Sequence, residues 1–165
     1  MNSIPVPAYE NQVKEGLFAR ARNVFWLAPM AGITDVCFRQ LMDEMNAGVL
    51  ISELVSAKGL FYNSEKTRKM MRVHPNGKSI TGIQLFGESA EDIIQASELV
   101  EATGADFVDI NLGCPVKKVV KKGCGAALLR DPAYLETFLS TIKRGIRIPL
   151  TVKMRTGWNE EELTI

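Results

Sequence analysis

The chain has 165 residues, of which 46% are hydrophobic and 24% are charged. This composition provides a core for about one domain and excludes a disordered or fibrous protein. Twenty basic and 19 acidic residues give a formal net charge of +1, so any affinity for a polyanion must come from local clusters of charge.

Short apolar runs alternate along the chain with helical patterns. The runs that predict five strands are "VFWLAPMAG" (24–32), "VLISELVS" (49–56), "SITGIQLFG" (79–87), "DFVDINLG" (106–113) and "PLTVKMRTG" (149–157). Helices are predicted in "TDVCFRQLMDEMNAG" (34–48), "SEKTRKMMRV" (64–73), "SAEDIIQASELVEATGA" (89–105) and "DPAYLETFLSTIKRG" (131–145). A loop containing Gly and Asn follows the second strand, and a loop containing cysteine follows the fourth.

Residues with known preferences for helix ends bound these helices. Thr34 can cap the first helix, and Gly48 can end it. Ser89 is the predicted N-cap of the third helix. Asp131 is the predicted N-cap of the fourth, with Pro132 in the first helical position.

Strands that alternate with helices imply parallel pairing through right-handed crossovers, so the fold class is α/β. The two candidates are a doubly wound open sheet and a (β/α)8 TIM barrel. The first turn, "APMAGIT", lacks the G-x-G-x-x-G loop of a dinucleotide-binding fold. Polar residues at the ends of the runs favour the barrel, whose active site lies at the carboxyl ends of its strands: Glu53, Gln84, Asn111, Lys153 and Arg155.

A TIM barrel has eight strands, whereas about five strands and four helices are predicted here. We therefore expect residues 24–165 to be the N-terminal portion of a larger barrel domain, after an N-terminal extension at 1–23. The two edges at Val24–Met30 and Leu150–Arg155 then lack partners, and we expect this chain alone to self-associate through them.

The fifth strand carries two cations on one face. Its alternation turns Leu150, Val152 and Met154 to one side, and Thr151, Lys153 and Arg155 to the other. Two buried cations on one face would need an anionic or electron-rich partner, but taken alone they are better explained by ordinary salt bridges. Gln84 and Asn111 could likewise only satisfy backbone groups at strand ends.

Two clusters of basic residues stand out. The first is Lys117, Lys118, Lys121 and Lys122, and the second is Lys66, Arg68, Lys69 and Arg72 with His74. Each cluster fits either solvated charge or contact with a polyanion.

The three cysteines Cys37, Cys114 and Cys124 lack the paired spacing of a disulfide framework or a zinc site. His74 is the only histidine, and we expect no metal. A reducing cytoplasm fits this cysteine usage. The sequence starts without a basic segment followed by an apolar core, and no apolar stretch approaches the ~20 residues that span a bilayer. We therefore expect no membrane association.

Four motifs carry a resemblance to a known family. "LAPMAGITDVCFRQL", "GIQLFG", "DINLGCPVKKV" and "TVKMRTGW" occur in the order and spacing of the tRNA-dihydrouridine synthases, and they most resemble the bacterial branch related to the nitrogen-regulation protein. The resemblance runs from Val24 to Trp158. It implies an FMN-binding TIM barrel with a helical tRNA-binding domain, in which NADPH-reduced flavin reduces the C5–C6 double bond of uridine in tRNA. We expect the later phosphate-binding loops and the helical domain of that family to lie outside residues 1–165.

The resemblance also implies roles for single residues. Cys114 matches the catalytic cysteine, which donates a proton at C5 after hydride reaches C6. A thiol with the reference pKa of about 8.5 is mostly protonated at neutral pH and can donate. The expected flavin contacts are Pro29, Met30, Ala31, Gln84 and Lys153. The expected substrate contacts are Asn111, which would read the uracil, and Arg155, which contacts substrate or flavin.

The roles of two residues are left undecided by the sequence, and two other functions are alternatives to dihydrouridine synthesis. Glu53 is either a polar residue of the site or a structural hydrogen-bond partner. Cys124 stands where the family usually has a small residue, and its expected role is packing. The first competing function is another FMN barrel, similar to dihydroorotate dehydrogenase. The second is a non-catalytic fragment that serves only in folding or RNA binding.

Overall fold

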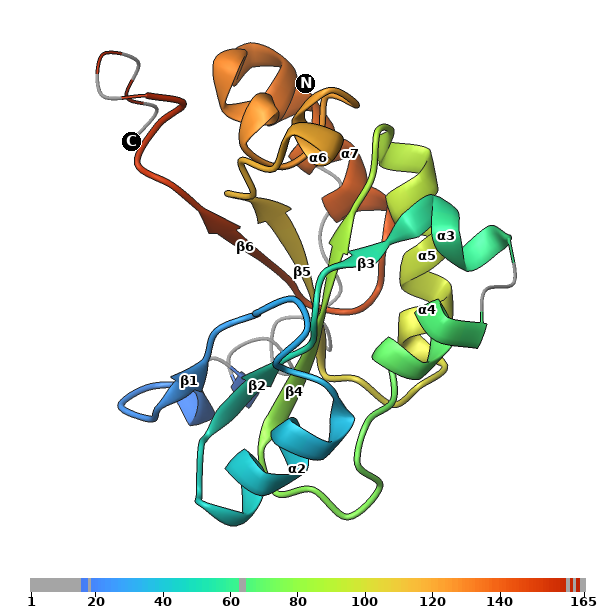
Figure 1. Cartoon of the computed structure of the whole chain (residues 1–165), viewed down its shortest axis with the longest axis vertical. Helices are drawn as coiled ribbons and strands as arrows, with labels where there is room; N and C mark the ends of the chain where they lie inside the picture. Colours follow the sequence, from blue (N-terminus) through green and yellow to red (C-terminus); the bar gives the residue numbers. More distant parts are fainter. Residues whose placement is uncertain (1–15, 18, 63–64, 160, 162, 164–165) are drawn as a thin grey trace, which may run out of the picture.

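In a computed structural model of the chain, residues 16–17, 19–62, 65–159, 161 and 163 are described. Their strands form one parallel sheet in the order β1-β2-β4-β5-β6, with β3 also paired to β4 (Figure 1). The strands are β1 (Trp26–Leu27), β2 (Val49–Ile51), β3 (Val55–Ser56), β4 (Ile80–Phe86), β5 (Phe107–Leu112) and β6 (Leu150–Met154).

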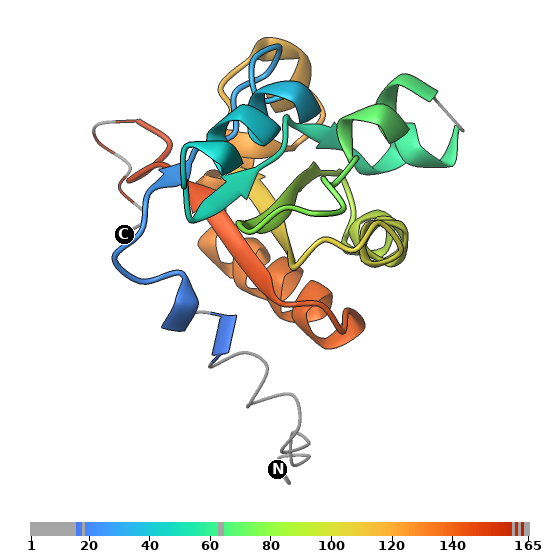
Figure 2. The same cartoon turned by 90° about the horizontal axis from the view of Figure 1, so that it is seen from below.

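The helices are α2 (Val36–Glu44), α3 (Ala57–Phe61), α4 (Glu65–Met70), α5 (Ala90–Glu101), α6 (Lys117–Val120), the 3-10 helix η1 (Gly125–Arg130) and α7 (Pro132–Gly145). Seen from below, α2, α5 and α7 lie around the outer side of a curled sheet (Figure 2). Parallel strands with helices outside form part of a TIM barrel, which confirms the predicted fold class.

Two apolar clusters sit on opposite sides of the sheet. On the outer side, Ile83 and Ile110 pack with residues of α5 and α7 such as Ile93 and Phe138. On the inner side, a smaller cluster fills the amino-terminal end of the barrel: Ala21, Val49, Ile51, Ile80 and Phe107. The carboxyl end of the inner side is therefore left to polar residues.

The second predicted strand is divided in two by a bulge. Ile51 pairs with Gly82 and Val55 pairs with Leu85, so three residues of one strand face two residues of the other. Ser52 fills the gap, because its N–H donates to the Gly82 carbonyl and its Oγ accepts from the Gln84 N–H, each at 3.0 Å. The regular alternation of the first half is therefore interrupted before β3.

Two predicted helix ends were wrong. Asp35, not Thr34, is the N-cap of α2, and its side chain accepts from the Phe38 N–H at 2.9 Å. The helix ends at Glu44, and Asn46 takes the left-handed conformation with φ of 62° that Gly48 was expected to provide. Gly48 has another role, because a Cβ there would lie 2.4 Å from that of Val24.

Two predicted loops were also wrong in part. The segment after β3 forms α3, and the segment after the cysteine forms α6 and η1. Ser89 and Asp131 are N-caps as predicted, since their side chains accept from Asp92 N–H and Tyr134 N–H.

The predicted extension at 1–23 lies mostly outside the described residues. Of its described part, Ala21 packs in the inner cluster, and its carbonyl accepts from Trp26 Nε1 at 3.1 Å. Along the chain that the structure describes, no helix is both long and apolar enough to cross a membrane. Trp26 and Val152 on the edge strands are 46% and 39% exposed, and self-association through these edges stays a prediction.

Candidate active site

A network of polar side chains, three of them buried, crosses the inner side of the sheet on β4, β5 and β6. We call it the inner polar network; its members are Gln84, Asp109, Asn111 and Thr151. Gln84 Nε2 donates to Asp109 Oδ2 at 2.6 Å, and Asn111 Nδ2 donates to Gln84 Oε1 at 3.0 Å. Thr151 Oγ1 donates to Asp109 Oδ1 at 2.6 Å. The register explains this arrangement, because Asp109 pairs with both Gln84 and Thr151.

Asp109 is the member that sequence reasoning missed. It is 2% exposed, and burial raises its pKa, although hydrogen bonds from Gln84 and Thr151 and the charge of Lys153 oppose the shift. The available signal was a carboxylate in the middle of an apolar run, two positions from Asn111 and therefore on the same face.

The cysteine loop is fastened to this network by its backbone. Asn111 Oδ1 accepts from the N–H groups of Gly113 and Cys114 at 3.3 Å and 2.9 Å. The Cys114 carbonyl accepts from the Ala126 N–H at 3.1 Å. Gly125 allows this approach, because its φ is 62° and a Cβ there would lie 2.8 Å from the same carbonyl. Cys114 is thus half-buried on a fixed backbone.

The loop after β1 is fastened from its own side. The Gly32 N–H donates to Glu53 Oε1 at 2.6 Å, so Glu53 makes the structural hydrogen bond that was one of its two expected roles. Within the loop, the Met30 N–H donates to Thr34 Oγ1 at 3.1 Å, and Thr34 Oγ1 donates to the Met30 carbonyl at 3.2 Å. These bonds hold the Pro29–Ala31 segment at the carboxyl end of β1.

A cavity of about 310 Å³ lies between β1 and β6 on the inner side of the sheet. Its lining residues are Trp26, Ala28, Pro29, Ile51, Asp109, Thr151, Val152 and Lys153. A larger hollow of about 440 Å³ lies between β6 and α7. The inner cavity therefore brings together Pro29 and Lys153 of the predicted cofactor contacts, and Gln84 reaches it through Asp109.

The remaining predicted residues lie around this cavity. Asn111 pairs with Lys153 in the sheet register. Arg155 passes close to the cysteine loop, because a Cβ on Gly113 would lie 3.4 Å from Arg155 Cγ. Both cations are exposed. Met30 and Ala31 are exposed as well, and neither lines the cavity.

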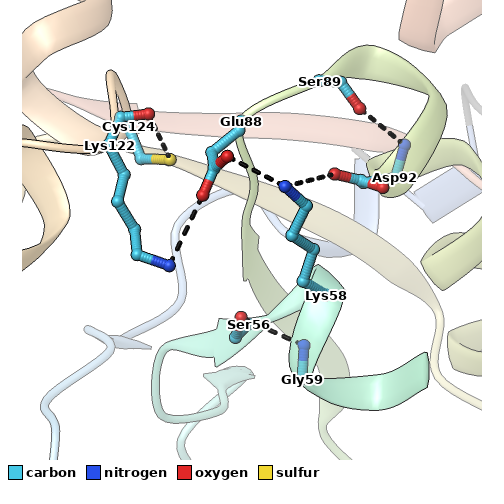
Figure 3. Close-up of polar contacts among 8 residues, drawn as sticks. All are labelled: Ser56, Lys58, Gly59, Glu88, Ser89, Asp92, Lys122 and Cys124. Carbon is cyan, nitrogen blue, oxygen red and sulfur yellow. Dashed lines mark hydrogen bonds and ion pairs between the residues drawn. The ribbon is translucent and has the colours of Figure 1, made fainter. Parts of the chain in front are cut away.

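One lysine of the first basic cluster is held by an ion-pair group (Figure 3). Glu88 accepts Lys58 Nζ at 2.9 Å and lies 3.4 Å from Lys122 Nζ, and Lys58 is also 3.9 Å from Asp92. The hydrogen bond with Glu88 raises the pKa of Lys58, and the same bond lowers the pKa of Glu88. Lys117, Lys118 and Lys121 are exposed and make no ion pair within the described part of the chain.

Cys124 lies beside this group but is buried, with 1% of its surface exposed. Its Sγ donates to the Lys122 carbonyl at 3.6 Å. Burial raises the pKa of its thiol to about 11.

In the second basic cluster, Lys69 pairs with Glu65 at 2.7 Å. Across the described residues, three or more His, Cys, Asp or Glu side chains nowhere gather to hold a metal ion.

The fold and the cavity together define a TIM-barrel protein whose polar site lies at the carboxyl ends of its strands. The family model for dihydrouridine synthases matches residues 26–165. The chain belongs to the dihydrouridine synthase family, as its motifs predicted.

Individual relatives agree with this assignment. The chain is 40% identical over 141 residues to tRNA-dihydrouridine synthase B of Proteus vulgaris, covering 86% of this chain and 43% of the relative. It is 40% identical over 138 residues to the protein of that name from Pseudomonas putida, covering 84% and 41%. The Escherichia coli K12 protein is 40% identical over 140 residues, covering 85% and 43%. The chain thus spans about two fifths of the length of these relatives.

Proposed function

We propose that the protein carrying this chain is a cytoplasmic tRNA-dihydrouridine synthase, which reduces the C5–C6 double bond of uridines in tRNA with FMN and NADPH. The observation that carries the proposal is the position of Cys114. Its backbone is held at 2.9 Å by Asn111 and at 3.1 Å by Ala126, directly after the strand that also supplies Asp109 to the cavity wall. A half-buried thiol on a fixed loop can meet a substrate in one orientation.

The residues around the cavity fit an isoalloxazine ring. Ala28 and Pro29 offer an apolar wall, and Lys153 offers a cation on the opposite strand. The inner polar network adds an amide and a carboxyl group for the polar edge of a ring. When bound, FMN supplies the hydride for reduction of the uracil. Lys153 would stabilise negative charge on the ring, and the loop at Pro29–Ala31 would hold its face.

The acid step belongs to the chain itself. The hydride brings two electrons to C6 of the uracil, and C5 then gains a proton, which completes the reduction. Cys114 would donate that proton from its thiol, and solvent would later restore it. Asn111 would orient the cysteine loop through its Oδ1, which already accepts two backbone N–H groups. It can read the uracil only with its remaining amide hydrogen.

The test compares two cysteines in the whole enzyme. Cys114→Ala should lower dihydrouridine formation in tRNA by ~10²-fold or more, while FMN content and NADPH oxidation stay near those of the unaltered enzyme. Cys124→Ala is the matched control, because that thiol is buried and its pKa is about 11. Equal loss of FMN from the Cys114 variant would contradict the proton-donor role. Equal loss of activity in both variants would show that the two thiols act together.

A further inference from the structure

Helix α2 buries two charged side chains beside the apolar residues Phe38 and Met42, which pack against the sheet. Of its nine residues, the two that are fully buried are Arg39 and Asp43, which are 3% and 8% exposed. They stand one turn apart on the same face. The cation contacts backbone carbonyls, and the anion contacts backbone N–H groups. Buried charges of this kind are retained only when hydrogen bonds satisfy them, so each one fastens α2 to a neighbouring segment.

Arg39 joins two segments that are separate in the sequence. Its Nη1 donates to the Thr34 carbonyl at 2.6 Å. Its Nη2 donates to the carbonyls of Arg72 at 2.5 Å and Met70 at 3.4 Å. The first contact lies in the loop after β1, and the other two lie at the end of α4. A guanidinium can do this because its donors diverge in a fixed plane, whereas an ammonium presents its donors at one point.

The Thr34 contact connects Arg39 with the candidate site. Thr34 is fully buried, and its Oγ1 is bonded to both the N–H and the carbonyl of Met30. The Thr34 N–H donates back to the Met30 carbonyl at 3.0 Å. On the opposite side, Glu53 accepts from Gly32 at 2.6 Å and also acts electrostatically on Arg39. The loop is therefore fixed between a buried cation and a carboxylate.

We propose that Arg39 is a positioning residue of the active site, which sets the conformation of the 28–34 loop by bonding it through Thr34 to the end of α4. The inference rests on the proposed function only for the claim that this loop faces the flavin. Arg39 touches neither substrate nor cofactor in this assignment. It acts through Thr34 on the Met30 backbone.

Asp43 provides a matched control on the same helix. It accepts from Lys78 N–H at 3.1 Å and Ser79 N–H at 2.7 Å, in the turn just before β4. It is buried and charged like Arg39, but its partners lie away from the cavity. A variant of Asp43 therefore reproduces the general cost of disturbing α2 without disturbing the loop.

The first experiment follows backbone hydrogen exchange in the whole enzyme. Arg39→Lys should speed exchange of the Met30 and Thr34 amides by about tenfold and leave Ser79 unchanged, since local opening follows local contacts. Asp43→Asn should give the reverse pattern. Thr34→Val removes the hydroxyl at nearly constant volume. It should speed exchange of the Met30 amide and leave the exchange rate of the Arg72 amide unchanged, because Arg39 still contacts the Arg72 carbonyl. Uniform acceleration along the chain in the Arg39 and Thr34 variants would overturn the positioning role.

The second experiment measures FMN in the whole enzyme by titration and by its visible spectrum. Arg39→Lys and Thr34→Val should each raise the FMN dissociation constant about tenfold and shift the bound flavin spectrum, whereas Asp43→Asn should change the constant less than about twofold. An Asp43 effect as large as the Arg39 effect would overturn the inference. If the enzyme binds no FMN at all, the proposed function fails, while the exchange pattern still decides the role of Arg39.

Discussion

Two buried carboxylates, one within β5 and one beside the turn before β4, show how partners, rather than burial, decide the state of a charged group. Asp109 and Asp43 are 2% and 8% exposed. Burial raises the pKa of Asp109, and its partners do not reverse the shift. Burial also acts to raise the pKa of Asp43, but the hydroxyl and N–H of Ser79 and the N–H of Lys78 outweigh it, so that pKa is lowered.

The difference in pKa distinguishes a carboxylate that stabilises the fold from one that belongs to the candidate site. Asp43 receives backbone donors from the turn before β4, and these hydrogen bonds help to lower its pKa. Asp109 receives only side-chain donors, and it lines the cavity with Lys153. A carboxylate whose compensation is incomplete and which faces a cavity is poised to respond to a ligand. The predictions below test this contrast, from the largest expected effect to the smallest.

Removing Asp43 should have the largest effect on stability. Asp43→Ala leaves the N–H groups of Lys78 and Ser79 without their acceptor, while the Ser79 hydroxyl keeps the Ala47 carbonyl, so the free energy of unfolding should fall by about 2–4 kcal/mol. Urea denaturation measures this change. Asp109→Asn keeps the shape of the side chain and can still accept from Gln84, so its cost should be much smaller. A larger fall in the free energy of unfolding for Asp109→Asn than for Asp43→Ala would contradict the different roles assigned to the two carboxylates.

The pH dependence of stability should have opposite signs for the two carboxylates. Because the pKa of Asp43 is lowered, its contribution is present above the ordinary value of 3.8 and is lost as pH falls through the lowered value. Because the pKa of Asp109 is raised, stability is lost as pH rises from 3.8 through the raised value.

Urea midpoints between about pH 3 and 7 check these signs. The stability of Asp109→Asn relative to the unaltered chain should increase with pH, since the variant never ionises there. The deficit of Asp43→Asn should shrink below pH 3.8. Parallel curves for both variants would show that neither carboxylate titrates as inferred.

The two cysteines of the 114–124 region extend the contrast to thiols. Cys124 is buried with a pKa of about 11, whereas Cys114 is half-buried. Alkylation by iodoacetamide at neutral pH should therefore modify Cys114 at least about tenfold faster than Cys124. Mass spectrometry of the digested protein gives both rates. Faster labelling of Cys124 would place that thiol at an accessible site and reverse the assignment.

The smallest effects are expected among the lysines. Replacing Lys117, Lys118 or Lys121 by Gln in the whole enzyme should reduce the slope of log affinity for tRNA against log salt by about 1 for each phosphate that the lysine neutralises. Lys122→Gln should reduce it less, because Glu88 already neutralises Lys122. Flavin reduction by NADPH is the control and should not change. A slope in all four variants equal to that of the unaltered enzyme would mean that these lysines are only solvated.

Sequence reasoning succeeded where the chain is regular. The alternation in 149–157 predicted the correct faces of β6, since Leu150 and Met154 pack on the outer core and Thr151 joins the inner polar network. It failed at Ser52, where a bulge changes the phase of the strand without any change in composition. It also chose Thr34 over Asp35 as the cap, because both residue types accept from helix N–H groups and only the backbone conformation decides between them.

The sequence predicted most residues of the candidate site, but it did not predict the hydrogen bonds between them. Motifs identified Gln84, Asn111 and Cys114, but they did not indicate that Asn111 links the other two. Asp109 and Arg39 were missed because a charged residue within an apolar pattern gives no indication of its partners. Those partners are distant in sequence, and only the register of the sheet brings them together.

The order of the sheet has a consequence for synthesis on the ribosome. Each main strand pairs with the one before it in the sequence, in the order β1-β2-β4-β5-β6. No strand among these has to wait for a segment made later in order to find its neighbour. Each new strand and helix can therefore dock on a template that has already left the exit tunnel, so apolar surface is covered as it appears.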